Sequence, residues 1–364
     1  MIIQIQPWID NSELEELKKV IESTYITENK MTELFENMTK KLTGSKYAIS
    51  VANGTVGLYC ALRSIDIGIG DEVIVPNLTF IASSNAVILA GAKPVFCDIK
   101  RETLTIDESK IPALINKNTK AIMPVHLYGF SAEMNELKKI ASKYNLKIIE
   151  DAAQGVGVKY KGKHVGPIGD MGVLSYYGNK TITTGEGGMI LTNNEEFAKR
   201  CYRLKNHGRD QKGTFMHNHI GFNFSFTDLQ AAIGVSQMKK LDKIINKKQV
   251  IFNKYFDSLK MIDELKFYKI KDQEKPVYWF SSFYSKKVDG IIDFLKNKGV
   301  QTRRFFYPLH LQPCYQKELL SINPDHFKVS EDVYFNSLSL PSSYVLKEQE
   351  QDFIIKNIKS FFKC

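Results

Sequence analysis

The sequence predicts an α/β fold, with a mostly parallel sheet wrapped by helices, followed by a smaller α+β domain. Short apolar runs alternate with helix-length stretches through the first half of the chain, which is typical of parallel strands joined by crossover helices. From about Phe226 a long passage with apolar residues at helical spacing takes over. The 364 residues exceed what one simple core holds, so we place a large domain at residues 1–240 and a small one at 241–364.

The N-terminal part begins with two predicted helices. The first covers residues 12–23, where Ser12 and Glu15 have the spacing of a capping box. The second, at about residues 28–42, leads into the β-branched run YAISV. The strand-like runs DEVIVP, AKPVFCDI, AIMPVHL and LKIIED follow, with helices expected at residues 79–90 and 131–144.

Two more strand-like runs, MGVLSYY and GGMILTN, flank the segment GNKTITTGE. After the long helical passage, which has room for one break, come the strand-like runs ELKFYKI, VYWFSSFYSK and VQTRRFFY. Helices are expected near residues 289–298 and from about residue 347. The sequence has no internal repeat and no low-complexity linker, so we expect the two domains to share a substantial interface.

Composition excludes several classes of protein. Hydrophobic residues at 43% and charged residues at 25% are ordinary globular values. No apolar run has the length of a membrane helix, and the start MIIQIQPWID has no cationic segment leading into an apolar core, so we expect a soluble, cytoplasmic protein. The five cysteines are scattered and never form a CxxC pair, which supports neither a disulfide framework nor a metal site.

The net charge of +10 raises the question of nucleic-acid binding. The lysines are spread through amphipathic stretches such as ELEELKKVIES rather than gathered in one block, which disfavours that interpretation. A basic protein also suits a small phosphorylated ligand.

Asn53-Gly54-Thr55 is the first candidate binding motif. It follows the YAISV run and opens a predicted helix. The free N–H groups at a helix N-terminus bind anions, so this turn is a candidate phosphate site. An ordinary turn with a helix cap is the alternative.

Asp151 is the second candidate, at the end of the apolar run KIIED. Ligands of open α/β sheets lie at the carboxyl ends of the strands, which is where this carboxylate is expected. A helix cap is the alternative, and a metal site is disfavoured because no His or second acid stands at a suitable spacing.

Lys180 is the third candidate, because it stands among small hydroxyl residues and glycines in SYYGNKTITTGEGGMI, five residues after Ser175. The segment has neither the G-x-x-x-x-G-K-[ST] nor the G-x-G-x-x-G pattern. Burial of a lysine favours its neutral, nucleophilic amine, so a covalent catalyst is one possibility and a solvated loop cation is the other.

Two aromatic segments complete the candidates: Phe80 in NLTFIASSNA, and TRRFFYPLH, which ends in His310. An aromatic at a strand-to-helix junction is either core or a platform for a flat ligand. His126 in PVHLYG is interpreted as a hydrogen-bonded strand histidine rather than a catalyst.

These motifs occur in the order of a known family. The chain resembles the DegT/DnrJ/EryC1/StrS family of pyridoxal-phosphate sugar aminotransferases in the NGT turn, NLTFIAS, PVHLYG, IEDAAQGVGVKYKGKHVGPIGDMGVLSYYGNKTITTGEGGM, KNHGRD, GFNFSFTDLQAAIG and TRRFFYPLH. The resemblance covers essentially the whole chain, and the segment from EDAAQ to GEGG is highly specific. It implies a fold-type I pyridoxal-phosphate-dependent transferase, with a large α/β/α domain and a smaller C-terminal α+β domain.

The resemblance also implies pyridoxal 5'-phosphate as cofactor. Lys180 matches the lysine that bonds to it, and Asp151 matches the acid that pairs with its ring nitrogen and keeps it an electron sink. The other cofactor-binding residues implied are the phosphate binders Gly54, Thr55 and Ser175, Phe80 over the cofactor ring, Gln154 near its 3'-oxygen, and Asn223, which reaches the phosphate from a neighbouring subunit.

If Asn223 acts in this way, the active site is shared within a homodimer. Family members usually have an Arg and an apolar residue after GxNx, where this chain has Ser225 and Phe226. The contact made by that arginine is therefore not expected here.

The form GNKTITTGEGGM most resembles the motif of enzymes that aminate C-4 of a nucleotide-linked 4-keto-6-deoxy sugar. The resemblance implies L-glutamate as the amino donor and an amino sugar that is used for surface polysaccharide synthesis. A GDP-linked substrate is preferred, and dTDP- and UDP-linked substrates are the alternatives. Arg303, Tyr307 and His310 are expected to face the sugar or its diphosphate, with a core position as the alternative for Tyr307.

Two rival functions keep the fold. In a few family members that are dehydratases a histidine replaces the lysine, and Lys180 argues against that reaction. A non-catalytic binding protein is the other rival, and retention of the cofactor residues disfavours it.

Overall fold

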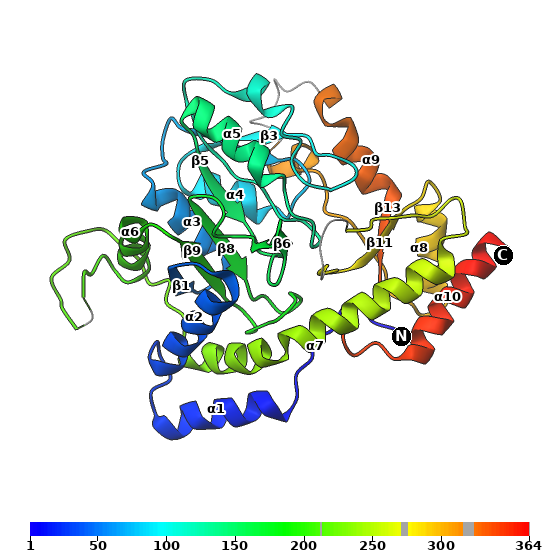
Figure 1. Ribbon diagram of the computed structural model, residues 1–364, viewed down its shortest axis with the longest axis horizontal. Coiled ribbons are helices and arrows are strands. Elements are labelled where there is room, and N and C mark those ends of the chain that lie inside the picture. Colours follow the sequence, from blue (N-terminus) through cyan, green and yellow to red (C-terminus); the bar gives the residue numbers. More distant parts are fainter. Residues whose placement is uncertain (212, 271–275, 316–323, 364) are drawn as a thin grey trace.

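The computed structural model describes residues 1–211, 213–270, 276–315 and 324–363. Within this part a seven-stranded sheet and a four-stranded sheet form two cores, joined by the long helix α7, Asp228–Leu259 (Figure 1). The N- and C-termini both lie on the side of the smaller sheet, and Ile2 forms a parallel bridge with Val300.

The large sheet is mostly parallel, as predicted. Its strand order is β1 (Tyr47–Val51), β9 (Gly188–Thr192), β8 (Met171–Ser175), β5 (Lys147–Asp151), β4 (Thr119–Ile122), β2 (Glu72–Pro76) and β3 (Lys93–Cys97). Only β9 runs antiparallel to its two neighbours. Nearly every residue of these strands is buried, because helices cover both faces. A short hairpin of β6 (Lys159–Tyr160) and β7 (Lys163–His164) lies outside the sheet.

The helices form two layers around the large sheet. On one face lie α3 (Gly54–Ser64), α4 (Ala82–Leu89) and α6 (Glu195–Lys205). On the other lie α2 (Lys30–Thr43), α5 (Met134–Tyr144) and the first half of α7. Successive strand residues alternate between the two faces of the large sheet, so Ile148 packs against the helices on one face and Ile149 against those on the other. This is the expected α/β/α arrangement.

Helix α7 connects the two cores. The helical passage predicted after Phe226 is one unbroken helix of 32 residues. Its first part packs against α1 (Asn11–Ser23) and α2, and its later part against α10 (Glu348–Phe362). The predicted boundary at residue 240 falls inside this helix.

The smaller core is antiparallel. Its strand order is β10 (Lys266–Phe267), β11 (Ser281–Tyr284), β13 (Ser337–Leu340) and β12 (Arg303–Arg304), with α8 (Val288–Asn297), α9 (Lys328–Asn336) and α10 around it. Apolar residues of the later part of α7, of α8 and of α10 pack together with this sheet in one core.

The predicted capping box of α1 is wrong by two residues. The cap is Asp10, whose Oδ1 accepts the backbone N–H of Ser12 at 2.9 Å, and Glu13 Oε2 accepts the N–H of Asp10 at 2.8 Å. Glu13 also accepts a hydrogen bond from Lys240 of α7 at 2.8 Å. This tertiary contact buries Glu13 and favours Asp10 over Ser12 as the cap.

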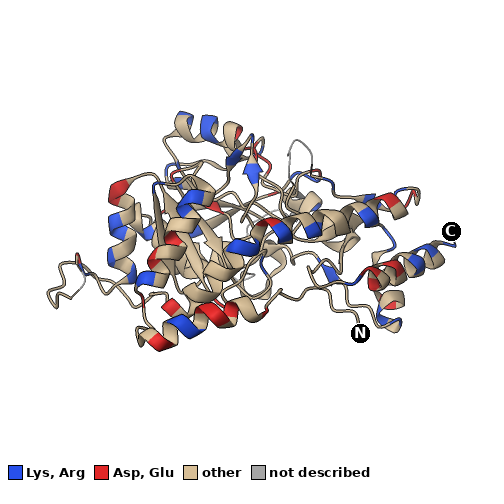
Figure 2. Ribbon diagram, turned by 60° about the horizontal axis from the view of Figure 1, so that its bottom comes forward, with Lys and Arg blue, Asp and Glu red and all other residues tan. Residues whose placement is uncertain are grey.

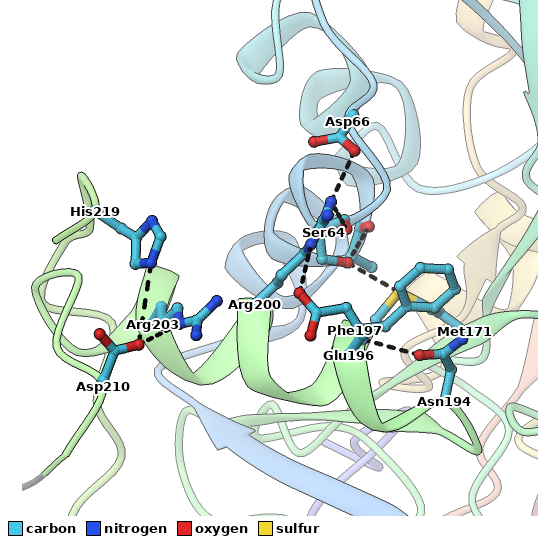
Figure 3. A network of polar contacts seen from close by, with 11 residues as sticks. Ser64, Asp66, Met171, Asn194, Glu196, Phe197, Arg200, Arg203, Asp210 and His219 are labelled. Carbon is cyan, nitrogen blue, oxygen red and sulfur yellow. Dashed lines mark hydrogen bonds and ion pairs between the residues drawn. The ribbon is translucent and has the colours of Figure 1, made fainter.

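Arg200 ties helix α6 to the end of α3 (Figure 3). Its Nη1 donates to Asp66 Oδ2 at 2.7 Å and to the carbonyl of Ser64 at 3.2 Å. Near the end of α6, Arg203 donates to Asp210 at 2.6 Å. Asp210 belongs to the loop after α6, which projects from the side of the large domain (Figure 1). The contact between Arg203 and Asp210 therefore ties the start of that loop to α6.

Charge is distributed along the chain. Lys and Arg occur on helices of both cores and are interleaved with Asp and Glu (Figure 2). In the described part of the chain no helix is long and apolar enough to span a membrane. The same residues contain no group of three or more His, Cys, Asp or Glu that could hold a metal ion.

Candidate active site

The candidate residues gather at the carboxyl edge of the large sheet. Asp151 is the last residue of β5 and Ser175 the last of β8. Asn53 lies between the end of β1 and the start of α3. Since β1, β5 and β8 are parallel to one another, these three chain ends lie on the same side of the sheet, where open α/β sheets bind ligands.

The start of α3 leaves two backbone donors available. Asn53 accepts the N–H of Val56 through its side chain at 2.9 Å and that of Gly57 through its carbonyl at 3.1 Å. For the N–H groups of Gly54 and Thr55, the described residues provide no acceptor. An anion placed there would satisfy both groups.

Close packing brings this turn against β8 and β9. A Cβ atom on Gly54 would lie 3.1 Å from the Cβ of Ser175 and 3.4 Å from its hydroxyl oxygen. A Cβ atom on Gly188 would lie 2.6 Å from the carbonyl oxygen of Asn53 and 2.9 Å from the N of Gly54. The absence of side chains at both glycines therefore places the Ser175 hydroxyl beside the free N–H groups of α3, which together suit a phosphate.

Asp151 is buried, with 4% of its surface exposed. Its Oδ2 accepts the hydroxyl of Ser83 at 2.6 Å, and its Oδ1 accepts the backbone N–H of Ala153 at 3.1 Å. Gln154, three residues on, is also buried and accepts the N–H of Tyr128 at 2.7 Å. These contacts fix the carboxylate and the amide at the strand end.

Threonine side chains hold the loop that carries Lys180. Thr183 Oγ1 donates to the carbonyl of Tyr176 at 3.0 Å and accepts the N–H of Gly185 at 2.9 Å. Thr184 Oγ1 donates to the carbonyl of Glu186 at 2.6 Å. The hydroxyl residues noted in the sequence thus bond to the loop's own backbone, which defines its path.

The amine of Lys180 is partly shielded from solvent. The residue is half-buried, and its Nζ lies 4.6 Å from the centre of the Trp279 ring. Burial lowers the pKa of Lys180 from 10.5 to about 8; the charge of Asp151 opposes this shift and that of Arg303 adds to it. A larger fraction of this amine is therefore neutral, and nucleophilic, near pH 7 than of an ordinary lysine.

Phe80 presents an aromatic ring at the same edge. It precedes α4, the helix from which Ser83 reaches Asp151, and 51% of its surface is exposed. Its ring centre lies 5.7 Å from that of Phe306. An exposed ring close to a buried carboxylate suits a flat aromatic ligand with a polar ring atom.

The three predicted substrate residues lie at and after β12. The guanidinium of Arg303 lies 5.8 Å from the ring centre of Phe306, and its charge contributes to the lowered pKa of Lys180. Tyr307 is 40% exposed and packs edge-on against Tyr334 at 5.0 Å.

His310 is held more tightly than the other two. Its Nδ1 lies 2.8 Å from Asn77 Nδ2, and its Nε2 lies 2.9 Å from Glu331 Oε1. Both ring nitrogens therefore have protein partners. In this arrangement the imidazole links the loop after β2 to helix α9.

Among the residues described, Asn223 makes no hydrogen bond to the other candidates, although its neighbour Phe224 accepts the N–H of Ala52, just before the NGT turn, at 2.9 Å. It is exposed near the base of the projecting loop, forms an antiparallel bridge with Asn206, and accepts the N–H of Ser225 at 3.3 Å. The structure gives it no hydrogen bond to Gly54, Thr55 or Ser175 within the described chain.

Sequence reasoning missed two residues of this site. Ser83 lies in the quoted run NLTFIASSNA, three residues after Phe80, and its spacing could have suggested that it shares the strand edge. Trp279 lies one hundred residues from the loop that it contacts, and no local signal indicates that contact.

The residues present fit pyridoxal phosphate. Free N–H groups and a hydroxyl suit its phosphate, a buried carboxylate suits its ring nitrogen, and a partly neutral lysine suits its aldehyde. The protein is a pyridoxal-phosphate-dependent aminotransferase of fold type I. The model of the DegT/DnrJ/EryC1/StrS aminotransferase family matches residues 7–359, and the chain belongs to that family.

Relatives and a solved structure agree with this assignment. The chain is 36% identical to the GDP-perosamine synthase of Escherichia coli O157:H7, over 98% of this chain and 97% of the relative. It is 35% identical to that of Vibrio cholerae over the full length of both. The structure of NtdA from Bacillus subtilis with bound cofactor PMP superposes with a TM-score of 0.89 at 30% identity, covering 100% of this chain and 86% of NtdA.

Proposed function

We propose that this enzyme transfers the amino group of L-glutamate to C-4 of a nucleotide-linked 4-keto-6-deoxy sugar. The preferred substrate is GDP-4-keto-6-deoxymannose, which would yield GDP-perosamine for a surface polysaccharide such as O-antigen. Two full-length relatives at 35 and 36% identity, named GDP-perosamine synthase, support this choice. A dTDP- or UDP-linked keto sugar is the alternative substrate, and a cytoplasmic location follows as an expectation.

The observation that carries the proposal is that the loop of Lys180, the carboxylate of Asp151 held by Ser83 and the free N–H groups at the start of α3 all follow strands that end at one edge of the large sheet. When bound, pyridoxal phosphate supplies an electron sink for the carbanion formed as the donor loses its α-proton. Asp151 would hold the ring nitrogen, and the amine of Lys180 would move that proton. Glutamate leaves as 2-oxoglutarate, and the keto sugar leaves as an amino sugar.

Arg303, Tyr307 and His310 are proposed for the sugar nucleotide. Arg303 is exposed and lies over Phe306, the ring that contacts Phe80, so its guanidinium would pair with the diphosphate. Tyr307, half-exposed, would line the approach. His310, bonded to Asn77 and Glu331, would act by holding this segment in place.

A homodimer with shared active sites is part of the proposal. The projecting loop after α6 exposes Phe215, Met216 and Ile220, each by 75% or more. Exposed apolar side chains of this size on one loop are typical of a protein–protein contact. Asn223 follows on the same loop, so docking of the loop on a second copy would carry Asn223 towards that copy's phosphate site.

The test supplies the enzyme with nitrogen-15-labelled glutamate and GDP-, dTDP- and UDP-linked 4-keto-6-deoxy sugars, and reads the products by mass spectrometry and NMR. We expect labelled nitrogen at C-4 of the sugar, with the fastest turnover for the GDP-linked substrate. Fastest turnover of a dTDP- or UDP-linked sugar would show that the preferred substrate carries that nucleotide instead of GDP. Loss of water without gain of nitrogen would instead indicate a dehydratase.

A further inference from the structure

Trp279 connects the smaller domain to the loop of Lys180. It lies just before β11 and is almost fully buried, with 1% of its surface exposed. Its indole N–H donates to the carbonyl of Asn179 at 2.7 Å. The face of the same ring lies 4.6 Å from the Nζ of Lys180. One side chain therefore contacts both the backbone before the lysine and the amine itself.

The ring of Trp279 is held by aromatic neighbours. Its centre lies 4.2 Å from that of Phe280, 5.6 Å from that of Tyr128 and 6.4 Å from that of Phe306. Tyr128 comes from the large domain, whereas Phe280 and Phe306 come from the C-terminal part of the chain. A ring packed in this way has little freedom to change rotamer.

The backbone of Trp279 is held separately by Lys248 of α7. The Nζ of this buried lysine donates to the carbonyl of Trp279 at 2.9 Å and to that of Ser342 at 3.0 Å. Within the described residues Lys248 forms no ion pair with a carboxylate. Since Ser281 of β11 pairs with Leu340 of β13, these two carbonyls lie at the same end of the smaller sheet, and Lys248 ties the two chain segments together there.

We propose that Trp279, anchored by Lys248, is a positioning residue for Lys180. This inference rests on the proposed role of Lys180 as the residue that bonds the cofactor. The indole N–H sets the path of the backbone at Asn179, and the ring face keeps the amine from turning away from the phosphate site. Because Trp279 comes from beyond α7, correct docking of the smaller domain is required to place the nucleophile.

The test separates cofactor binding from bond formation in Trp279→Phe, which keeps an aromatic ring and removes the N–H donor. Pyridoxamine phosphate has no aldehyde, so its affinity, measured by calorimetry, reports the phosphate and ring sites alone. The rate at which pyridoxal phosphate gains absorbance at about 420 nm reports bonding to the lysine. We expect this rate to fall by roughly three- to tenfold, the value of one hydrogen bond, with pyridoxamine phosphate affinity within about twofold of wild type.

Trp8→Phe is the matched control: Trp8 lines the same small cavity as Lys180 and has the amine of Lys240 at 4.6 Å from its ring centre, but within the described residues its indole donates no hydrogen bond to the loop of Lys180. We expect it to change neither quantity. Lys248→Met should likewise slow the bonding of pyridoxal phosphate and leave the affinity for pyridoxamine phosphate unchanged. This variant tests the proposal if Trp279→Phe does not fold. Equal changes in both quantities, or a change in neither, would overturn the proposal. Failure of the wild type to bond pyridoxal phosphate at Lys180 would instead contradict the proposed function.

Discussion

At the residue scale, Lys180 and Lys248 differ from two buried lysines, Lys205 and Lys240, in having no carboxylate partner in the part of the chain that the structure describes. Lys205 pairs with Glu28 at 2.9 Å, and Lys240 pairs with Asp10 and Glu13 at 2.8 Å. Lys180 and Lys248 have no ion-pair partner within 4.0 Å among the described residues, and burial lowers the pKa of both. A buried amine without a carboxylate partner loses its proton more readily, which is what covalent catalysis requires.

The reactivity of Lys180 should therefore follow pH differently from that of an ordinary lysine. In the cofactor-free protein we expect trace acetylation of Lys180, read by mass spectrometry, to reach half its maximal rate near the pKa of about 8. Asp151→Asn should move this midpoint to lower pH, since the Asp151 charge raises the pKa of Lys180. Arg303→Met should move it to higher pH, since the Arg303 charge lowers that pKa. A wild-type midpoint near the ordinary lysine value of about 10.4 would contradict this assignment.

At the scale of elements, the start of α3 depends on the close approach of β9. A methyl group at Gly188 would lie 2.6 Å from the carbonyl oxygen of Asn53, closer than real Cβ contacts occur. Gly188→Ala should therefore displace the turn and weaken binding of pyridoxamine phosphate by roughly tenfold or more, the equivalent of one or two hydrogen bonds to the phosphate. Calorimetry of the cofactor-free protein measures this.

Gly178→Ala is the control for that prediction. A Cβ atom at Gly178 would have its nearest neighbour, the carbonyl oxygen of Gly185, at 4.0 Å. We expect unchanged affinity. Equal losses in the two variants would show that any alanine in this region weakens binding, and the close-approach explanation would then be wrong.

The lowered pKa of Lys248 leads to a second prediction at this scale, about stability and pH. Its pKa in the folded protein is lowered to about 7, whereas an unfolded lysine titrates near its ordinary value. Between these values the unfolded chain binds more protons, so the free energy of unfolding rises with pH, by at most about 1.4 kcal/mol per pH unit for this group. Lys248→Met should lose this rise. Urea unfolding at about pH 7 and about pH 9 measures the free energy of unfolding of both proteins. An equal rise in the wild type and in Lys248→Met would contradict the prediction.

Two elements that sequence reasoning missed are short and rich in polar residues. Helix α6 packs Phe197, Ala198, Cys201 and Leu204 on the core, but most of its other residues are charged. Strand β13 contains Ser337 and Ser339, which are buried through hydrogen bonds to Tyr268 and Ser282. Serines that are paired across a sheet cannot be recognised from hydrophobic alternation. The strands of the large sheet were predicted because their apolar runs are continuous.

At the scale of the whole molecule, the site combines residues that local sequence can predict with residues that it cannot. Asp151 and Ser175 end predicted strands, and parallel strands end at one edge, so their proximity follows from the pattern. Trp279 and Arg303 reach Lys180 only through the docking of the smaller domain. That docking depends on packing between segments far apart in the chain, which periodicity does not encode.

The proposed shared active site predicts complementation between variants. Lys180→Ala and Asn223→Ala should each lack most activity as homodimers. In a heterodimer, one site would combine the intact Lys180 of one chain with the intact Asn223 of the other. Equal mixing after unfolding and refolding should restore about one quarter of wild-type activity, because half the dimers are mixed and each has one intact site. No recovery, with mixed dimers verified by mass spectrometry, would contradict the sharing.

The most direct measurement is to locate the bond between cofactor and protein. The purified enzyme is incubated with pyridoxal phosphate, reduced with borohydride, digested and analysed by mass spectrometry. We predict one modified residue, Lys180, and loss of both the modification and the absorbance at about 420 nm in Lys180→Ala. Modification at a different lysine, or full absorbance in Lys180→Ala, would contradict the assignment of Lys180 as the nucleophile.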